Sequence, residues 1–199
     1  LLSSEAITIS KLETMESGTT LWSNRWCPDG EAPPVWGKVM TDLMKTDPST
    51  RVDHWLYMRW DAPAHCLLDV GITPVGKTRE DGVWVYTGHH LTPVNSTRSL
   101  YHWSVIRNHA TDSKEIDAFW QMSIDAAFVG QDKPIIEAQQ VAMGNRGVDE
   151  LNLVAIPADI AGGKARRSLS RLIANEAAGS RPQPNTSPLH ELLAKSAGS

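Results

Sequence analysis

The sequence contains only two cysteines among its 199 residues. Neither Cys27 nor Cys66 belongs to a Cys-x-x-Cys or Cys-x-His pair. Isolated cysteines of this kind are typical of free thiols in a reducing compartment. We therefore expect a cytoplasmic protein whose cysteines are not joined in disulfides.

The sequence also lacks any apolar run near the ~20 residues that are needed to span a bilayer. Its first residues, Leu1–Glu5, have neither the basic start nor the apolar core of a signal peptide. An excess of positive charge is missing too, since the net charge is −4. Neither nucleic acid nor an anionic membrane surface is thus expected as a partner. Because the sequence does not begin with Met, we expect it to be part of a longer protein.

What the sequence does have is the composition of a globular domain, with 41% hydrophobic and 21% charged residues. Its length is enough for one substantial core. Eight tryptophans is a high number. Aromatic residues in strands pack a core more often than they line a pocket for a flat ligand, but both remain open. Six of the tryptophans fall in expected strands: Trp22, Trp26, Trp55, Trp60, Trp84 and Trp103.

The first two thirds of the chain are expected to form β-structure. Ala6–Glu13 and Thr19–Cys27 alternate loosely between apolar and polar residues, and a short helix is expected over Val35–Lys45. The short connections between the later strands favour an antiparallel sheet. Four stronger strand candidates follow the helix, at Asp53–Trp60, His65–Thr73, Val83–Thr92 and Arg98–Asn108.

The pattern then becomes helical. Apolar residues at helical spacing predict a helix over Ser113–Val129, and Pro134 predicts a kink or a restart close to Asp132. A final helix is expected over Ala158–Ala178. Strands followed by long helices are typical of an α+β domain, with a curved sheet around a long helix. We expect one domain over residues 1–179 and a flexible tail over 180–199.

The most informative segment is Phe128–Gln140. Asp132 lies there among apolar helical neighbours, with Phe128 at i−4, Ile135 at i+3 and Ile136 at i+4. A charged group among apolar neighbours is costly unless it has a partner. A metal ion or a hydrogen-bond donor could be that partner. Asp132 could also cap a restarting helix, because Asp is a favoured N-cap residue.

The run Gln131-Asp-Lys-Pro-Ile-Ile-Glu-Ala resembles the final iron-ligand motif of Rieske-type non-haem iron oxygenases, close to the vanillate O-demethylase branch. Leu1–Ala6, Val52–Trp60, Gly88–Pro93 and Leu100–Trp103 also look like segments of that family. The resemblance therefore covers almost the whole chain. It implies the catalytic domain of an oxygenase component, with a helix-grip (START/Bet v 1-like) fold.

The resemblance implies that Asp132 is one ligand of a mononuclear Fe(II). Such a site needs two imidazoles and one carboxylate, and it leaves positions open for O2 and substrate. The family's His-x4-His pair has no counterpart before Asp132, so we expect both His ligands upstream of Leu1. A Rieske [2Fe–2S] cluster needs two Cys and two His. We expect that cluster on a preceding N-terminal domain.

By position in the family, Leu56, Leu68, His89 and Ser123 would face the substrate pocket. The two leucines make that pocket mostly apolar, with His89 as its hydrogen-bonding group. His89 could instead be a structural histidine with satisfied hydrogen bonds. His89 and His90 cannot easily bind one ion, because adjacent strand residues point to opposite faces. We expect an aromatic substrate that carries a single hydrogen-bonding group.

The implied activity is O-demethylation or hydroxylation of an aromatic compound with O2. Electrons would come from NAD(P)H through a separate reductase or ferredoxin component, and a homotrimer is also implied. A protein of another class stays open, namely a metal-free helix-grip domain that binds a hydrophobic small molecule. A hydrolase-like enzyme that uses His89 is a weaker possibility, since no nucleophile motif supports it.

Overall fold

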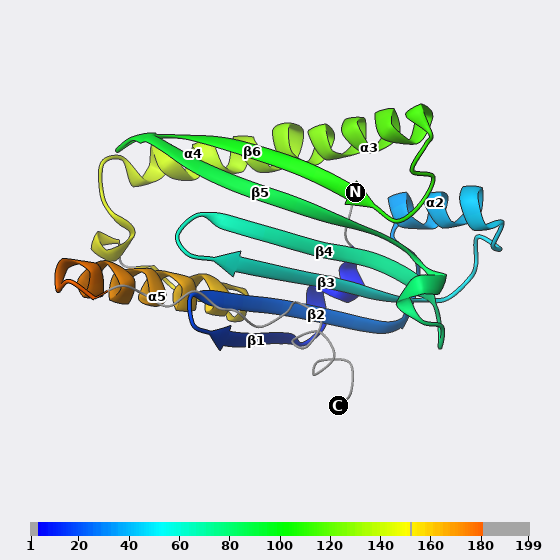
Figure 1. The fold of residues 1–199 in the computed structure, drawn as a ribbon, viewed down its shortest axis with the longest axis horizontal. Coiled ribbons are helices and arrows are strands. Elements are labelled where there is room, and N and C mark those ends of the chain that lie inside the picture. The colour runs from blue at the N-terminus through cyan, green and yellow to red at the C-terminus, as the bar shows by residue number, and fades with distance from the viewer. Residues whose placement is uncertain (1–3, 152, 181–199) are drawn as a thin grey trace.

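The computed structural model describes residues 4–151 and 153–180. Figure 1 shows an antiparallel sheet of six strands, whose order in the sheet is their order in the chain. Each strand forms antiparallel hydrogen bonds with the next strand in the chain, as the sequence predicted. Short segments join most of these strands, and a segment that contains helix α2 joins β2 to β3. The strands are β1 (Leu12–Ser17), β2 (Thr20–Gly30), β3 (Val52–Asp61), β4 (His65–Pro74), β5 (Val83–Asn95) and β6 (Arg98–Arg107).

Helices flank this sheet. In Figure 1, α3 and α4 follow one another along the β6 side, and α5 lies along the β1–β2 side. Within the described part of the chain, none of the helices combines the length and apolar character that crossing a membrane requires. The helices are α1 (Glu5–Ile9), α2 (Pro34–Met44), α3 (Lys114–Ala127), the π-helical turn η2 (Phe128–Asp132), α4 (Lys133–Met143) and α5 (Ile160–Ala177). Short 3-10 turns, η1, η3 and η4, lie at Arg79–Asp81, Val148–Glu150 and Pro157–Asp159.

The main core lies between the sheet and helices α2 and α3. Alternate residues of the central strands point to this side, which we call the helix face. Trp36 of α2 and Trp120 of α3 meet over it, with ring centroids 5.0 Å apart. Burying each large apolar side chain here contributes about 1.5–3 kcal/mol. The strand residues of this core are Val52, Val70, Ile72, Val83 and Val85.

The opposite side of the sheet, the outer face, carries a smaller aromatic core of Trp22, Trp55 and Tyr57. The core role that the sequence allowed for the strand tryptophans is therefore confirmed for Trp22 and Trp55. A buried ion pair lies beside them. Arg79 donates to both carboxylate oxygens of Asp69, each at 2.7 Å, and Trp55 Nε1 donates to the same carboxylate at 2.8 Å.

One predicted strand is wrong. Ala6–Glu13 divides into helix α1 and the start of strand β1. The Ser4 side chain accepts a hydrogen bond from the Ile7 backbone N–H and caps the helix, while Ile7 is only 1% exposed. A capped turn with one buried anchor thus overrides the loose alternation. The predicted α+β class is confirmed, and the other predicted elements occur with small shifts in their bounds. Beyond Ser180, the predicted tail lies outside the described residues.

Candidate iron and substrate site

Asp132 ends the π-helical turn η2. The Lys133 backbone N–H donates to the carbonyl of Phe128, five residues back, and α4 continues the same rod. The interruption expected at Pro134 is therefore a one-residue widening of the helix, because a π turn tolerates the missing N–H. Widened turns of this kind occur frequently at functional sites.

The predicted apolar surroundings of Asp132 are not realised. Its side chain is exposed, and Ile135 and Ile136 are 62% and 60% exposed. The capping alternative is wrong as well, because the Asp132 backbone is helical (φ −75°, ψ −48°) and its side chain makes no cap hydrogen bond. The carboxylate thus has no local structural role that would occupy its oxygens.

The Tyr101 hydroxyl on strand β6 lies in the electrostatic field of the Asp132 carboxylate. Burial, and then the negative charge of Asp132, raise the pKa of the Tyr101 hydroxyl to about 12. Tyr101 is therefore a neutral phenol at physiological pH. Its hydroxyl is hydrogen-bonded to Nδ1 of His89. Tyr101 is thus bonded to His89 and close enough to Asp132 for the charge of that carboxylate to act on its hydroxyl.

His89 is enclosed by aromatic rings. It is 8% exposed, and it lies opposite Cys66 of β4 and Trp103 of β6 in the sheet register. The Phe128 ring lies 5.4 Å from the imidazole, between centroids. Burial, and then the charge of His90, lower the pKa of His89 to about 4, so the imidazole is neutral at physiological pH.

The two nitrogens of His89 differ. Nδ1 is bonded to Tyr101, whereas Nε2 is fully buried and has no hydrogen-bond partner among the described residues. Within the described part of the chain, His89 therefore has a hydrogen-bond partner at Nδ1 but not at Nε2. Buried polar atoms without partners are rare, and they are commonly found where a ligand or water completes the site.

Sequence reasoning missed three members of this site: Tyr101, Trp103 and Phe128. Alternation along β6 places Tyr101 and Trp103 on one face, and Phe128 lies one helical turn before Asp132. The ring centroids of Tyr101 and Trp103 lie 5.9 Å and 6.1 Å from the ring centroid of Phe128. The alternation could have paired the two strand residues, but only the register of β5 against β6 shows that they enclose His89.

The four residues predicted to face substrate all lie toward the helix face. Ser123 is buried on α3, while Leu56 and Leu68 are half-buried on β3 and β4. Leu68 pairs with Thr87, which places it roughly 8 Å from His89 by strand spacing. Leu56 pairs with Val70 and lies farther along the sheet, roughly 16 Å from His89. The structure thus brings Leu68 close to His89 and leaves Leu56 more distant.

The potential metal donors in the described part of the chain are dispersed rather than clustered. No group of three or more His, Cys, Asp or Glu side chains among these residues is arranged to hold a metal ion. Asp132 fits an iron site as a single carboxylate donor, because its side chain is exposed and caps no helix. Two further ligands are needed for the three-residue iron site.

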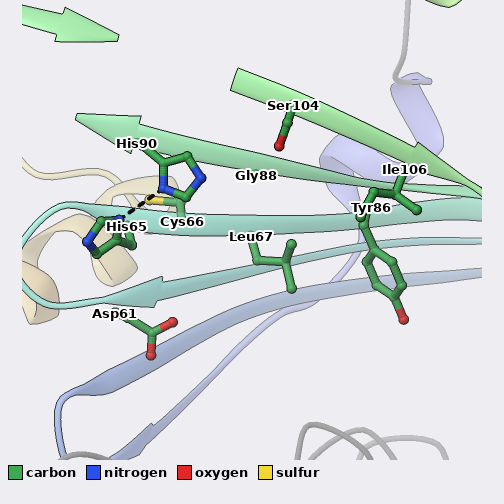
Figure 2. A pocket seen from close by; sticks show the side chains of 9 residues that line it. All are labelled: Asp61, His65, Cys66, Leu67, Tyr86, Gly88, His90, Ser104 and Ile106. Carbon is green, nitrogen blue, oxygen red and sulfur yellow. Dashed lines mark hydrogen bonds between the residues drawn. The ribbon is translucent and has the colours of Figure 1, made fainter. Parts of the chain in front are cut away.

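A separate depression lies on the outer face (Figure 2), and Asp132 is not among the residues that line it. It measures about 290 Å³, and His65 Nδ1 and His90 Nδ1 approach to 3.0 Å at its edge. His89 and His90 therefore do point to opposite faces, as the sequence predicted. The lining residues are Asp61, His65, Cys66, Leu67, Tyr86, Gly88, His90, Ser104 and Ile106.

The whole domain matches a known family. Residues 3–175 match the vanillate O-demethylase oxygenase C-terminal domain. The chain is 30% identical, over 88% of its length, to the oxygenase component of chloroacetanilide N-alkylformylase from Rhizorhabdus wittichii (strain DC-6 / KACC 16600). It is 27% identical, over 83% of its length, to the vanillate O-demethylase oxygenase subunit from Pseudomonas sp. (strain HR199 / DSM 7063). The chain spans 49% and 47% of these two relatives, about half of each.

Solved structures support the same fold. Dicamba monooxygenase bound to 3,6-dichlorosalicylic acid matches with a TM-score of 0.75 and 22% identity, over 87% of this chain and 50% of that one. The enzyme bound to dicamba matches with a TM-score of 0.71 and 22% identity, over 87% of this chain and 49% of that one. At this identity the likeness establishes the fold. The chain belongs to the vanillate O-demethylase oxygenase C-terminal domain family.

Proposed function

We propose that this chain is the catalytic domain of the oxygenase component of a Rieske-type monooxygenase. The reaction would be O-demethylation or hydroxylation of an aromatic compound. The observation that carries the proposal is Asp132, an unengaged carboxylate on a π turn beside Tyr101 and the buried His89. Membership of the family and relatives named as oxygenase components support it.

Asp132 would supply one ligand to a mononuclear Fe(II), and two histidines outside this sequence would supply the others. When bound there, iron would supply the activation of O2 for transfer to the substrate. The [2Fe–2S] cluster would lie on another domain and receive electrons from NAD(P)H through a reductase or ferredoxin. The designation of relatives as oxygenase components supports such a separate partner. We also propose a cytoplasmic homotrimer, in which residues 1–179 form one domain.

The substrate ring would lie between the helix face and α3. Leu68, Trp103 and Phe128 would supply apolar area, and His89 would orient the polar substituent of the substrate. A few polar groups among many apolar ones are typical of small-molecule sites. Leu56 and Ser123 would shape the more distant walls. Because Nε2 of His89 is sealed in this structure, a neighbouring side chain must move when a substrate binds.

A second function is a metal-free domain that binds a hydrophobic small molecule. The observation in its favour is that no group of three or more metal donors, with or without Asp132, forms among the described residues. This reading predicts a protein that binds aromatic compounds but holds no iron in any form. The oxygenase proposal instead predicts that the 199-residue chain purifies without stoichiometric iron, and that adding the preceding domain restores it.

The test compares Asp132→Ala with Asp125→Ala in the protein that includes the preceding domain. Both carboxylates are exposed on the same helical rod, but only Asp132 acts on the pKa of Tyr101. Asp132→Ala should lose iron and turnover, with a stability change within about 0.5 kcal/mol. Asp125→Ala should keep iron and turnover. An Asp132→Ala protein that retains iron and activity would remove Asp132 from the ligand set.

A further inference from the structure

The hydrogen bond between Tyr101 and His89 determines what Nε2 can offer a ligand. A neutral imidazole carries one N–H, so the two ring nitrogens must take opposite roles. If Nδ1 accepts from the Tyr101 hydroxyl, then Nε2 carries the proton and is a donor. If Nδ1 donates to the Tyr101 oxygen, then Nε2 is an acceptor.

The chemistry of the two groups favours the first arrangement. A phenol O–H is a more acidic donor than a neutral imidazole N–H, and an imidazole nitrogen is a more basic acceptor than a phenol oxygen. The Tyr101 and His89 rings are nearly parallel, with an interplanar angle of 12°. Across these stacked rings the Tyr101 hydroxyl is hydrogen-bonded to Nδ1.

We propose that Tyr101 is a positioning residue that holds His89 with its proton on Nε2, so that the site selects aromatic substrates bearing a hydrogen-bond acceptor oxygen. The inference rests on the proposed function, because it concerns the same site. An ether, carbonyl or carboxylate oxygen would accept from Nε2–H. A substrate that presents an N–H or O–H there would place two donors against each other.

The burial of Nε2 gives this preference its strength. The atom is closed off by the chain and has no partner among the described residues. Burial shields Nε2 from water, so a substrate oxygen that accepts from it is favoured over a group that leaves it without a partner. The Phe128 ring, 5.4 Å from the imidazole, adds to this enclosure and lies on the same π turn as Asp132.

Nitrogen NMR on the 15N-histidine-labelled protein at pH 8 tests the tautomer without any need for turnover. The resonances of His89 are identified among those of the seven histidines by their loss in His89→Gln. We expect Nε2–H and an unprotonated Nδ1 in the wild type, and a shift toward the other tautomer in Tyr101→Phe. Tyr86→Phe, on the outer face of the sheet, is the matched control and should leave the spectrum of His89 unchanged.

A spectrum that is the same in Tyr101→Phe and the wild type would overturn the role of Tyr101. A wild-type spectrum with the proton on Nδ1 would overturn it too. Thermal melting of Tyr101→Phe shows whether the variant is folded. If it is not, wild-type protein that contains 3-fluorotyrosine takes its place. Its more acidic phenol should move the Nδ1 resonance of His89, and an unmoved resonance would overturn the role.

Ligand binding tests the substrate class. Anisole and N-methylaniline have the same shape but present an ether oxygen or an N–H at the same position. Quenching of tryptophan fluorescence should show anisole binding about 2- to 10-fold more tightly, as one hydrogen bond predicts. The preference should disappear in Tyr101→Phe. Tighter binding of N-methylaniline would overturn the acceptor preference.

The outcomes separate this inference from the proposed function. If the tautomer responds to Tyr101→Phe but neither ligand binds, then the positioning role holds and the pocket assigned under the proposed function fails. If the ligands bind with the expected preference but the complete enzyme holds no iron, then the acceptor selectivity holds and the oxygenase assignment fails.

Discussion

Trp120 Nε1 donates a hydrogen bond to Nε2 of His109 at 3.0 Å, and this bond joins α3 to the segment that follows strand β6. His109 Nδ1 lies 3.0 Å from the Asn108 side-chain oxygen, so both imidazole nitrogens have partners. Because Nε2 accepts, the proton of the neutral ring lies on Nδ1. Burial, and then the charge of Arg107, lower the pKa of His109 to about 4.

Replacing Trp120 by Phe should destabilise the protein by about 1–3 kcal/mol, because Nε2 of His109 loses its donor inside the core. Trp26→Phe is the matched control. Trp26 is 45% exposed, and its replacement should change stability by less than about 0.5 kcal/mol. Urea unfolding of both variants measures the difference. Equal unfolding midpoints would mean that the bond to His109 contributes nothing.

Stability should fall as the pH is lowered from 6.5 to about 4. Burial lowers the pKa of His54, His89 and His109 from 6.5 to about 4 in the folded protein. The unfolded chain therefore takes up protons first, and stability present above pH 6.5 is lost across this window at up to about 1.4 kcal/mol per pH unit for each histidine. Denaturant titrations at several pH values measure the slope.

The variant His54→Leu isolates one of these contributions. His54 is 1% exposed, and neither of its ring nitrogens has a partner among the described residues. The substitution should flatten the pH dependence and leave stability at pH 8 equal or higher, because it removes a buried polar group without a partner. A slope identical to that of the wild type would show that His54 does not stay neutral in the fold.

Arg79→Met should cost about 3–5 kcal/mol, because it leaves the Asp69 carboxylate buried without a counter-charge. The Asp69 side chain is only 1% exposed, and the Arg79 guanidinium also covers the Trp84 ring at 4.7 Å. Lys38→Met breaks the exposed pair with Asp42 and should cost under about 1 kcal/mol. Thermal melts compare the two, and a similar loss in both would refute the burial argument.

In the complete oxygenase proposed above, His89→Ala should change the position attacked or uncouple O2 consumption from product more than it weakens binding. Losing one hydrogen bond costs only ~0.5–1.5 kcal/mol of affinity, but a tilted ring moves the reacting atom. Product analysis and O2 uptake measure this. His90→Ala, whose side chain lies on the outer face, is the control. Unchanged products and coupling in His89→Ala would exclude His89 from the pocket.

The strands could be predicted because their signal is local. Alternation with a period of two and short turns located β3 to β6 with small errors at their ends. Helical spacing likewise located α3, which begins at Lys114 with Ser113 as its N-cap. The prediction failed at Ala6–Glu13 because the structure there depends on more than the local pattern. Ile7 is buried by contacts with strands that lie far away in the sequence, and local alternation does not reveal such contacts.

The surroundings of Asp132 could not be predicted for a related reason. Apolar neighbours at i+3 and i+4 indicate burial only if another element packs on that side of the helix, and α4 has no buried residue among those described. The enclosure of His89 by Tyr101 and Phe128 depends on strand register and on the path of η2. The register of β5 against β6 is set by the packing of the whole domain. A single sequence therefore shows these residues without showing that their side chains are in contact.

The order of the strands bears on how the chain folds. Since β1 to β6 pair only with their neighbours along the chain within this sheet, every pairing except β2 with β3, which are separated by α2, closes a short loop and can form early. The contact between Lys164 of α5 and Thr14 of β1 joins residues 150 positions apart. Closing so long a loop costs more entropy, so α5 should dock last, onto strands already in place.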